Sequence, residues 1–124
     1  MSTEQVLKAK VKWPVSIKAN GSSSDGVTLY LSTNEAYIRC AKPLRLYELF
    51  DMTLQVPDSD DCVEAQVEVV FSNIYGPDDE ISPRGMIVRF LEISSENQKI
   101  IAKAINQKLQ SDNVEIDTKN LQTL

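Results

Sequence analysis

Apolar and polar residues alternate with period two over most of the chain, which is the pattern of strands with one buried and one solvent-facing side. The alternation runs through six segments, at about residues 11–18, 27–32, 36–40, 52–56, 63–71 and 85–91. Stretches rich in turn residues separate several of them, at residues 20–26, 57–61 and 73–84. Six short strands with such connections predict an all-β domain, and we expect a six-stranded antiparallel β-barrel.

The apolar positions of these segments predict the core. We expect it to contain Val11, Trp13, Val15, Ile17, Leu29, Leu31, Ile38, Leu54, Val67, Val69, Val88 and Phe90, with Phe71 also facing inward. Truncating a fully buried Phe90 to Ala should cost about 3–5 kcal/mol. Because Pro14 has no amide donor, the first strand should lie at an edge or begin its pairing after that residue.

The period changes to about 3.6 near residue 95, which predicts a C-terminal helix. Ser95 to Gln98 fits a capping box with Ser95 as the N-cap, and Ile101, Ile105 and Leu109 then form one apolar stripe. We expect the helix at about residues 95–110, packed on the barrel. Residues 1–110 would then form one domain, and the polar, aperiodic residues 111–124 a flexible tail.

Composition and charge narrow the function classes. The formal net charge of −5 disfavours binding to nucleic-acid polymers, which usually relies on a basic face. No apolar run approaches the roughly 20 residues of a membrane span. The first five residues lack the basic start and apolar stretch of a signal peptide, so we expect a cytoplasmic protein with two reduced cysteines.

The residue types needed for catalysis are scarce. The chain has no histidine, which removes the usual general base near neutral pH, the commonest metal ligand and every Ser-His or Cys-His nucleophile. Its four glycines form no phosphate-binding loop. We expect neither an enzyme nor a bound cofactor or metal.

One motif carries a family resemblance. Lys8 stands four residues before Lys12-Trp13-Pro14-Val15, Ser32 follows twenty residues later, and the strand Gly85–Phe90 precedes a helix. Over residues 8–105 this resembles the PilZ domain, in which an R-x-x-x-R segment often runs into an apolar residue and Pro-Val, and a [D/N]-x-S-x-x-G turn follows. The resemblance implies a six-stranded barrel with a C-terminal helix, and a bacterial receptor for cyclic di-GMP.

The ligand positions of the motif depart from that pattern. Lys8 and Lys12 replace the two arginines, Tyr30 replaces the acid or amide, Glu35 replaces the glycine, and Ser32 matches. Lysine supplies charge for phosphates but cannot make the flat, bidentate and stacked contact of an arginine with guanine. Lys8, Lys12 and Ser32 are therefore candidate ligand-binding residues for a nucleotide that binds weakly or no longer binds. Each also fits an ordinary role, the lysines as solvated strand charges and Ser32 as a turn cap.

Three functions remain open. The first is a PilZ-like adaptor in a motility, pilus or second-messenger pathway that acts by contacting another protein. Its candidate surface holds Lys10, Tyr37 and Arg39 beside the other lysines, and the C-terminal helix, widened by Ile100, is the alternative surface. The second is a cyclic di-GMP receptor with a lysine-based site. The third is a small barrel of unrelated family, which a different strand order would support.

Overall fold

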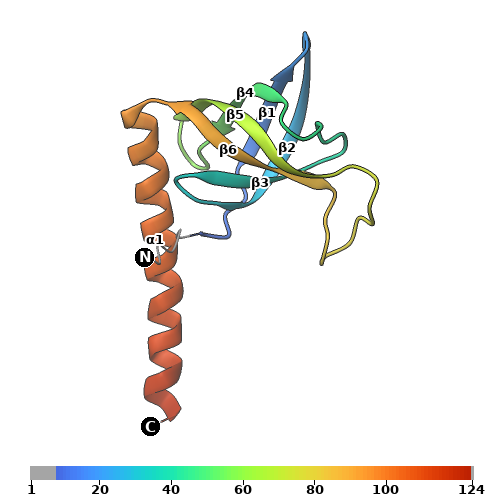
Figure 1. Cartoon of the computed structure of the whole chain (residues 1–124). Coiled ribbons are helices and arrows are strands. Elements are labelled where there is room, and N and C mark those ends of the chain that lie inside the picture. Colours follow the sequence, from blue (N-terminus) through green and yellow to red (C-terminus); the bar gives the residue numbers. More distant parts are fainter. Residues whose placement is uncertain (1–7, 124) are drawn as a thin grey trace, which may run out of the picture.

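The structure, a computed structural model, describes residues 8–123, with side chains described as far as residue 111. Six strands and one helix follow each other along the chain (Figure 1). They are β1 (Pro14–Ala19), β2 (Ser22–Leu31), β3 (Glu35–Cys40), β4 (Leu49–Gln55), β5 (Cys62–Asn73), β6 (Gly85–Ile93) and α1 (Ser95–Thr123).

The strands close into a barrel in the order β1-β2-β3-β6-β5-β4, with every neighbouring pair antiparallel. This confirms the predicted six-stranded antiparallel barrel with a C-terminal helix. Closure pairs β1 on both sides, so it is not an edge strand. Pro14 is the first residue of β1, where it pairs with Val27 of β2, and pairing with β4 begins only at Val15. The expectation that pairing begins after Pro14 is therefore met only on the β4 side.

The connection between β1 and β2 is shorter than the sequence suggested. Asn20 and Gly21 have φ values of 53° and 77°, and Ala19 pairs with Ser22 across them. An Asn-Gly pair with positive φ at both residues makes a two-residue hairpin turn whose twist matches that of the strands. The loop predicted at residues 20–26 is therefore wrong beyond Gly21, and a long hairpin rises from the barrel (Figure 1).

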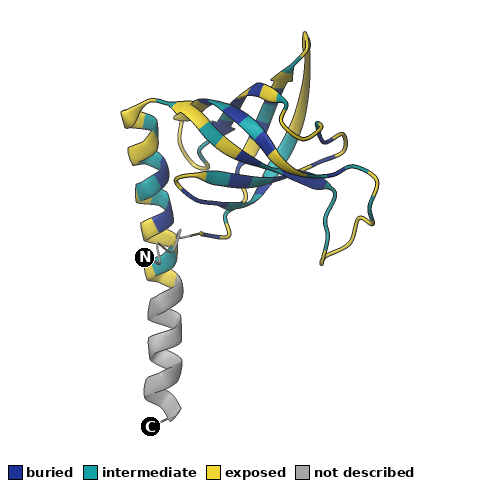
Figure 2. Ribbon diagram, viewed as in Figure 1, coloured by how far each residue is buried: buried dark blue, intermediate teal, exposed yellow. Residues whose placement is uncertain are grey.

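The barrel interior follows the predicted alternation with four exceptions, and Figure 2 shows buried and exposed residues taking turns along the strands. Trp13, Val15, Ile17, Leu31, Ile38, Leu54, Val67, Val69 and Val88 are buried as predicted. Val11 and Phe90 are only partly buried against the core. Leu29 and Phe71 face outward, because the register shifts between Thr28 and Tyr30 and again between Val69 and Phe71. A bulge of this kind turns two consecutive residues toward the same face, here Leu29 with Tyr30 and Val70 with Phe71.

The helix begins and ends differently from the prediction. Ser94, not Ser95, is the N-cap: its Oγ accepts the amide of Asn97 at 3.1 Å, and its carbonyl accepts the amide of Gln98. The helix runs to Thr123 rather than ending near Gln110. No glycine or proline occurs after Gly85, so the sequence lacks the two strongest helix breakers in this segment.

One face of α1 completes the core. Ile101 and Ile105 are fully buried, and Ile100, Ala104 and Leu109 pack beside them. The side-chain amide of Asn97 also donates to the Glu64 carbonyl on β5. The first part of α1 is therefore packed on the barrel, as expected. The side chains of the expected tail lie outside the described part from residue 112 onward.

Two simpler features concern the cysteines and the helix. Cys40 is buried and Cys62 exposed, and both are free thiols. In the part of the chain that the structure describes, no helix is both long and apolar enough to cross a membrane.

Candidate functional site

A groove of about 790 Å³ lies on the outer surface of the barrel beside β2 and β3. The segment before β1, the two strands and the loop between β5 and β6 line it, through Lys8, Ala9, Lys10, Lys12, Leu29, Tyr30, Tyr37, Arg39, Asp78, Asp79, Glu80 and Pro83. Five of the six residues selected from the sequence therefore come together in one site: Lys8, Lys10, Lys12, Tyr37 and Arg39. Ser32 does not line it.

A bulge in β2 shapes the groove. Thr28 points inward and is fully buried, and its Oγ1 accepts the amide of Trp13 at 2.8 Å and donates to the Val11 carbonyl at 2.5 Å. These bonds fasten the segment before β1 to β2 where the main-chain register is interrupted. Leu29 and Tyr30 consequently both lie on the outer face, under the three lysines. The regular alternation of this segment gives no sign of the bulge.

The basic wall is formed by the lysines of the segment before β1. The Lys8 Nζ lies 3.3 Å from Glu35 Oε1 and 4.7 Å from the centroid of the Tyr30 ring. The hydrogen bond to Glu35 is the main reason that the pKa of Lys8 is raised. Glu35, at the position where the PilZ pattern has glycine, therefore holds the first lysine of the motif in an ion pair.

Two tyrosines form the floor. Tyr30 and Tyr37 are cross-strand partners, with ring centroids 5.8 Å apart in an edge-to-face arrangement, and Phe71 continues the row 6.5 Å beyond Tyr37. The Tyr37 hydroxyl donates to the Pro83 carbonyl at 2.7 Å. Burial raises the pKa of both tyrosines, so their hydroxyls keep their protons near neutral pH. The floor is thus a fixed, uncharged aromatic surface.

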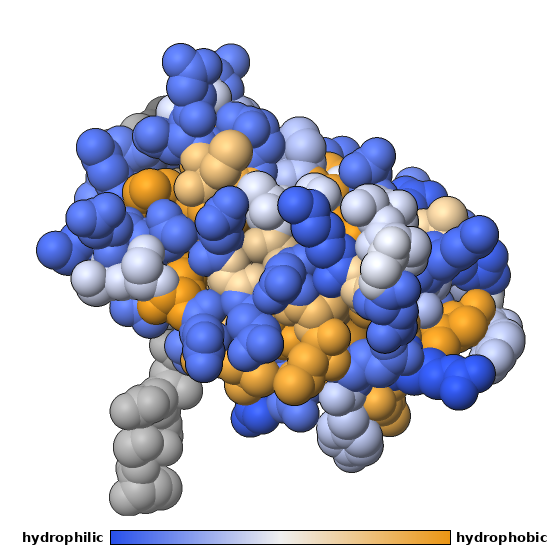
Figure 3. Space-filling model, turned by 90° about the horizontal axis from the view of Figure 1, so that it is seen from above, coloured by the Kyte–Doolittle hydropathy of each residue, from blue (hydrophilic) through white to orange (hydrophobic). Residues whose placement is uncertain are grey.

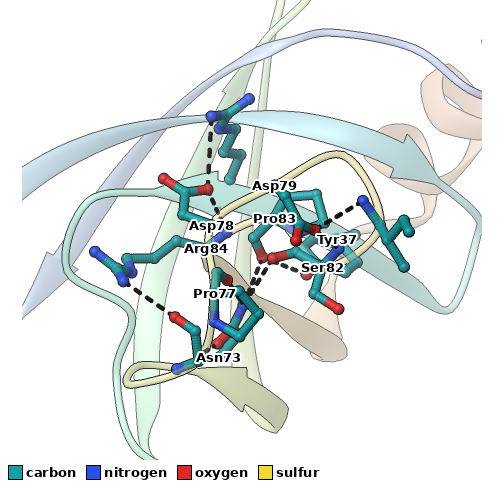
Figure 4. Close-up of polar contacts among 11 residues, drawn as sticks. Tyr37, Asn73, Pro77, Asp78, Asp79, Ser82, Pro83 and Arg84 are labelled. Atoms are coloured by element: carbon teal, nitrogen blue, oxygen red, sulfur yellow. Dashed lines mark hydrogen bonds and ion pairs between the residues drawn. The ribbon is translucent and has the colours of Figure 1, made fainter.

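The opposite wall is the loop between β5 and β6, which Asn73 organises (Figure 4). The buried Asn73 side chain donates through Nδ2 to the carbonyls of Pro77, Ser82 and Pro83, at 2.9–3.1 Å, and its Oδ1 accepts the Gly76 amide. A buried amide with this many partners fixes the path of the loop at both of its ends.

The acids of this loop are largely engaged. Asp78 Oδ1 accepts the Arg84 amide and lies 3.6 Å from the Arg39 guanidinium. Asp79 Oδ1 accepts the amides of Ile81 and Ser82. Asp78, Asp79 and Glu80 line the site but were not among the candidate residues selected from the sequence. Nothing in the sequence ties Asn73 to the carbonyls of residues 77–83, since that contact depends on the loop's path.

Ser32 is committed to the turn between β2 and β3. Its side chain is fully buried, its Oγ accepts the amides of Asn34 and Glu35 at 3.1 and 2.9 Å, and it donates to the Glu35 carbonyl at 3.1 Å. A hydroxyl has one donor and two acceptor positions, and all three are used here. Ser32 therefore acts as the turn cap that the sequence allowed.

The chemistry of the groove is aromatic and ionic. Among the described residues, no group of three or more His, Cys, Asp or Glu side chains could hold a metal ion. What the groove offers is an aromatic floor between a basic and an acidic wall.

Comparison with known proteins places the fold. No family model and no curated protein matches the chain. Two solved structures do resemble it. The first is the Bacillus subtilis inhibitor of motility MotI/DgrA, with a TM-score of 0.69 and 14% sequence identity over 90% of this chain. The second is the PilZ domain of YcgR from Escherichia coli with c-di-GMP, with a TM-score of 0.66 and 13% sequence identity over 94% of this chain. The aligned part spans 52% of MotI/DgrA and 98% of the YcgR domain. Strand number, barrel closure and near-complete coverage together show that this chain has the fold of a PilZ domain.

Proposed function

We propose that this protein is a non-enzymatic bacterial signalling adaptor, a PilZ-fold domain that works by protein–protein contact in a motility, pilus or second-messenger pathway. Direct binding of cyclic di-GMP is weak or lost. The observation that carries the proposal is that Lys8 and Lys12 line the groove where the PilZ pattern has two arginines, and that Lys8 is paired with Glu35 and lies over Tyr30.

Most of the expected loss of affinity for cyclic di-GMP comes from the two missing arginines. An exposed ion pair such as Lys8–Glu35 is worth at most about 1 kcal/mol, so by itself it would not exclude a nucleotide. A bidentate arginine contact with guanine is worth about 1–3 kcal/mol. Two missing contacts would weaken binding by about 2–6 kcal/mol, or about 30-fold to more than 10,000-fold. The lost guanine contacts therefore matter more than the ion pair.

Two features of the groove support a protein partner. Tyr37 and Arg39 belong to the residue types that most often anchor interfaces, and both line the groove. The other candidate surface is the C-terminal helix. Among its described side chains, Ile100, Ile101 and Ile105 pack against the barrel and leave less apolar surface for a partner. The adaptor proposal therefore assigns the contact to the groove, with Lys10, Tyr37 and Arg39 as its candidate residues.

A cyclic di-GMP receptor with a lysine-based site is the second candidate. Its support is that Lys8 and Lys12 line the same groove as two tyrosines, on which a base could stack. The YcgR structure contains c-di-GMP in a domain of this fold. A strand order different from that of PilZ domains would have supported an unrelated barrel family, and the chain has the PilZ fold instead.

Calorimetric titration with cyclic di-GMP at physiological salt separates the two candidates. The adaptor proposal expects no saturable binding at low micromolar nucleotide. Sub-micromolar affinity would establish the receptor instead, and Lys8→Ala and Lys12→Ala should then abolish it. A variant with both lysines changed to Arg, together with Tyr30→Asp and Glu35→Gly, should bind more tightly. It restores the bidentate arginine contacts, the acid that accepts hydrogen bonds from guanine, and the glycine of the PilZ pattern. It serves as the positive control.

Capture of partners from the source bacterium tests the adaptor directly. The double variant Tyr37→Ala/Arg39→Ala should lose them, and a chain ending at Gln110 should retain them, because Ile101 and Ile105 still complete the core. The opposite pattern would move the interface to the helix.

A further inference from the structure

The groove contains positive charge that the protein itself does not neutralise. Lys8 is paired with Glu35, and Arg39 with Asp78. Lys10 and Lys12 are exposed, line the groove, and have no ion-pair partner among the side chains that the structure describes, those of residues 8–111. Two adjacent cations at the mouth of a groove favour a ligand that brings its own negative charge.

The spacing of these two lysines is defined. The segment that carries them is fastened to β2 at both ends, by the paired main-chain bonds of Ala9 with Leu31 and by Trp13 with Thr28. Burial alternates along this run as in an extended chain, with Ala9 and Trp13 buried and Lys10 and Lys12 exposed. The backbones of the two lysines are then about 6–7 Å apart, with both residues on the outer side. Acidic side chains at alternate positions of an extended chain have the same separation.

The rest of the groove limits where those acids can lie. Asp78, Asp79 and Glu80 stand on the opposite wall, and the hydrogen bonds of Asn73 hold their loop in place. A ligand that was acidic along its whole length would be repelled there. Between the walls, Leu29, Tyr30, Tyr37 and Pro83 provide an apolar and aromatic floor, which suits an apolar anchor side chain.

We propose that the groove binds an extended peptide segment of a protein partner, with an apolar or aromatic anchor on the Tyr30–Tyr37 floor and two acidic residues at alternate positions on one flank, paired with Lys10 and Lys12. The inference rests on the proposed adaptor function and names the chemistry of its partner. A volume of about 790 Å³ accommodates a few residues of such a segment. On the face drawn in Figure 3, hydrophilic residues divide the apolar surface into separate patches.

Selection from a random peptide library on the immobilised full chain tests the proposal, with displayed peptides of about 12 residues, which span about 40 Å when extended. Enriched peptides should share an aromatic or branched apolar residue and two Asp or Glu residues at alternate positions on one side of it. Synthetic copies should bind Lys10→Ser/Lys12→Ser at least about tenfold more weakly, a loss of about 1.4 kcal/mol. The control Lys18→Ser/Lys99→Ser makes the same charge change at exposed lysines outside the groove and should bind as the unaltered protein does.

Three results would overturn the inference: enriched peptides that are basic or uncharged, peptides that bind the Lys10/Lys12 variant as tightly as the unaltered protein, or no enrichment at all. The adaptor function would survive each of them if native partners were still captured through Tyr37 and Arg39. Conversely, sub-micromolar binding of cyclic di-GMP together with failure to capture any protein would refute the adaptor itself.

Discussion

The two faces of β3 belong to regions of opposite character. On the inner face, Ala36 and Ile38 are fully buried among apolar side chains. On the outer face, Tyr37 and Arg39 line a groove. Tyr37 makes one hydrogen bond and Arg39 one ion pair with the loop between β5 and β6. The inner face is stabilised by area removed from water, and the outer face by a few directional contacts. Function can therefore change on the outside while the barrel stays the same.

Adjacent substitutions in β3 should expose this difference most strongly. Ile38→Ala leaves a cavity in a closed barrel and should lower the free energy of unfolding by about 2–5 kcal/mol. Arg39→Ala, at an exposed position, should cost less than about 1 kcal/mol. Urea denaturation measures both. Similar costs for the two variants would show that the groove is part of the stabilising core.

Asn73 connects the two regions, because its buried side chain organises the acidic wall. Asn73→Ala removes the bond from the Gly76 amide and the contacts with three carbonyls that share two amide hydrogens, and should cost about 2–3 kcal/mol. Asn73→Asp keeps the acceptor for Gly76 but turns a carboxylate toward three carbonyls, so it should be at least as damaging. Hydrogen exchange should accelerate at residues 76–84 in both variants. Unchanged exchange there would mean that the loop is held by other contacts.

Alkaline pH should lower the free energy of unfolding through ionisation of the buried Cys40 thiol. Burial raises the pKa of this thiol from 9.0 to about 11. The folded protein then holds the proton more tightly than the unfolded chain does, so this contribution is complete below pH 9 and is lost as pH rises to 11. The loss should be about 2 kcal/mol. Denaturation of Cys40→Ala across this range checks it, since Tyr30 and Tyr37, whose pKa values are also raised by burial, titrate in both proteins. Equal slopes for the two proteins would contradict the assignment.

The smallest effect is expected at the ion pair of Lys8 with Glu35. A double-mutant cycle with Lys8→Ala and Glu35→Ala should give a coupling of about 0.2–1 kcal/mol, and added salt should reduce it. A coupling above that range would mean that this pair is a structural element of the barrel.

The same contrast explains how far the sequence could be interpreted. Period-two alternation depends only on strand geometry, so it identified the six strands and most of the interior, including Trp13 and Leu54. Leu29 was wrongly assigned to the core because a bulge leaves the alternation of residues intact while reversing the faces. Five groove residues followed from the family pattern and from residue type. The acidic wall was missed because it depends on hydrogen bonds between Asn73 and residues distant along its loop.

Site-specific photo-crosslinking in living cells of the source organism tests the central claim most directly, since it reports which face touches another protein. A crosslinking residue replaces Lys10 in the groove, Lys18 on β1 outside it, or Lys103 on the exposed side of α1. We predict a discrete protein adduct at position 10 and none at positions 18 and 103. Adducts at position 103 or 18 with none at position 10 would contradict the assignment of the groove as the protein-contact site.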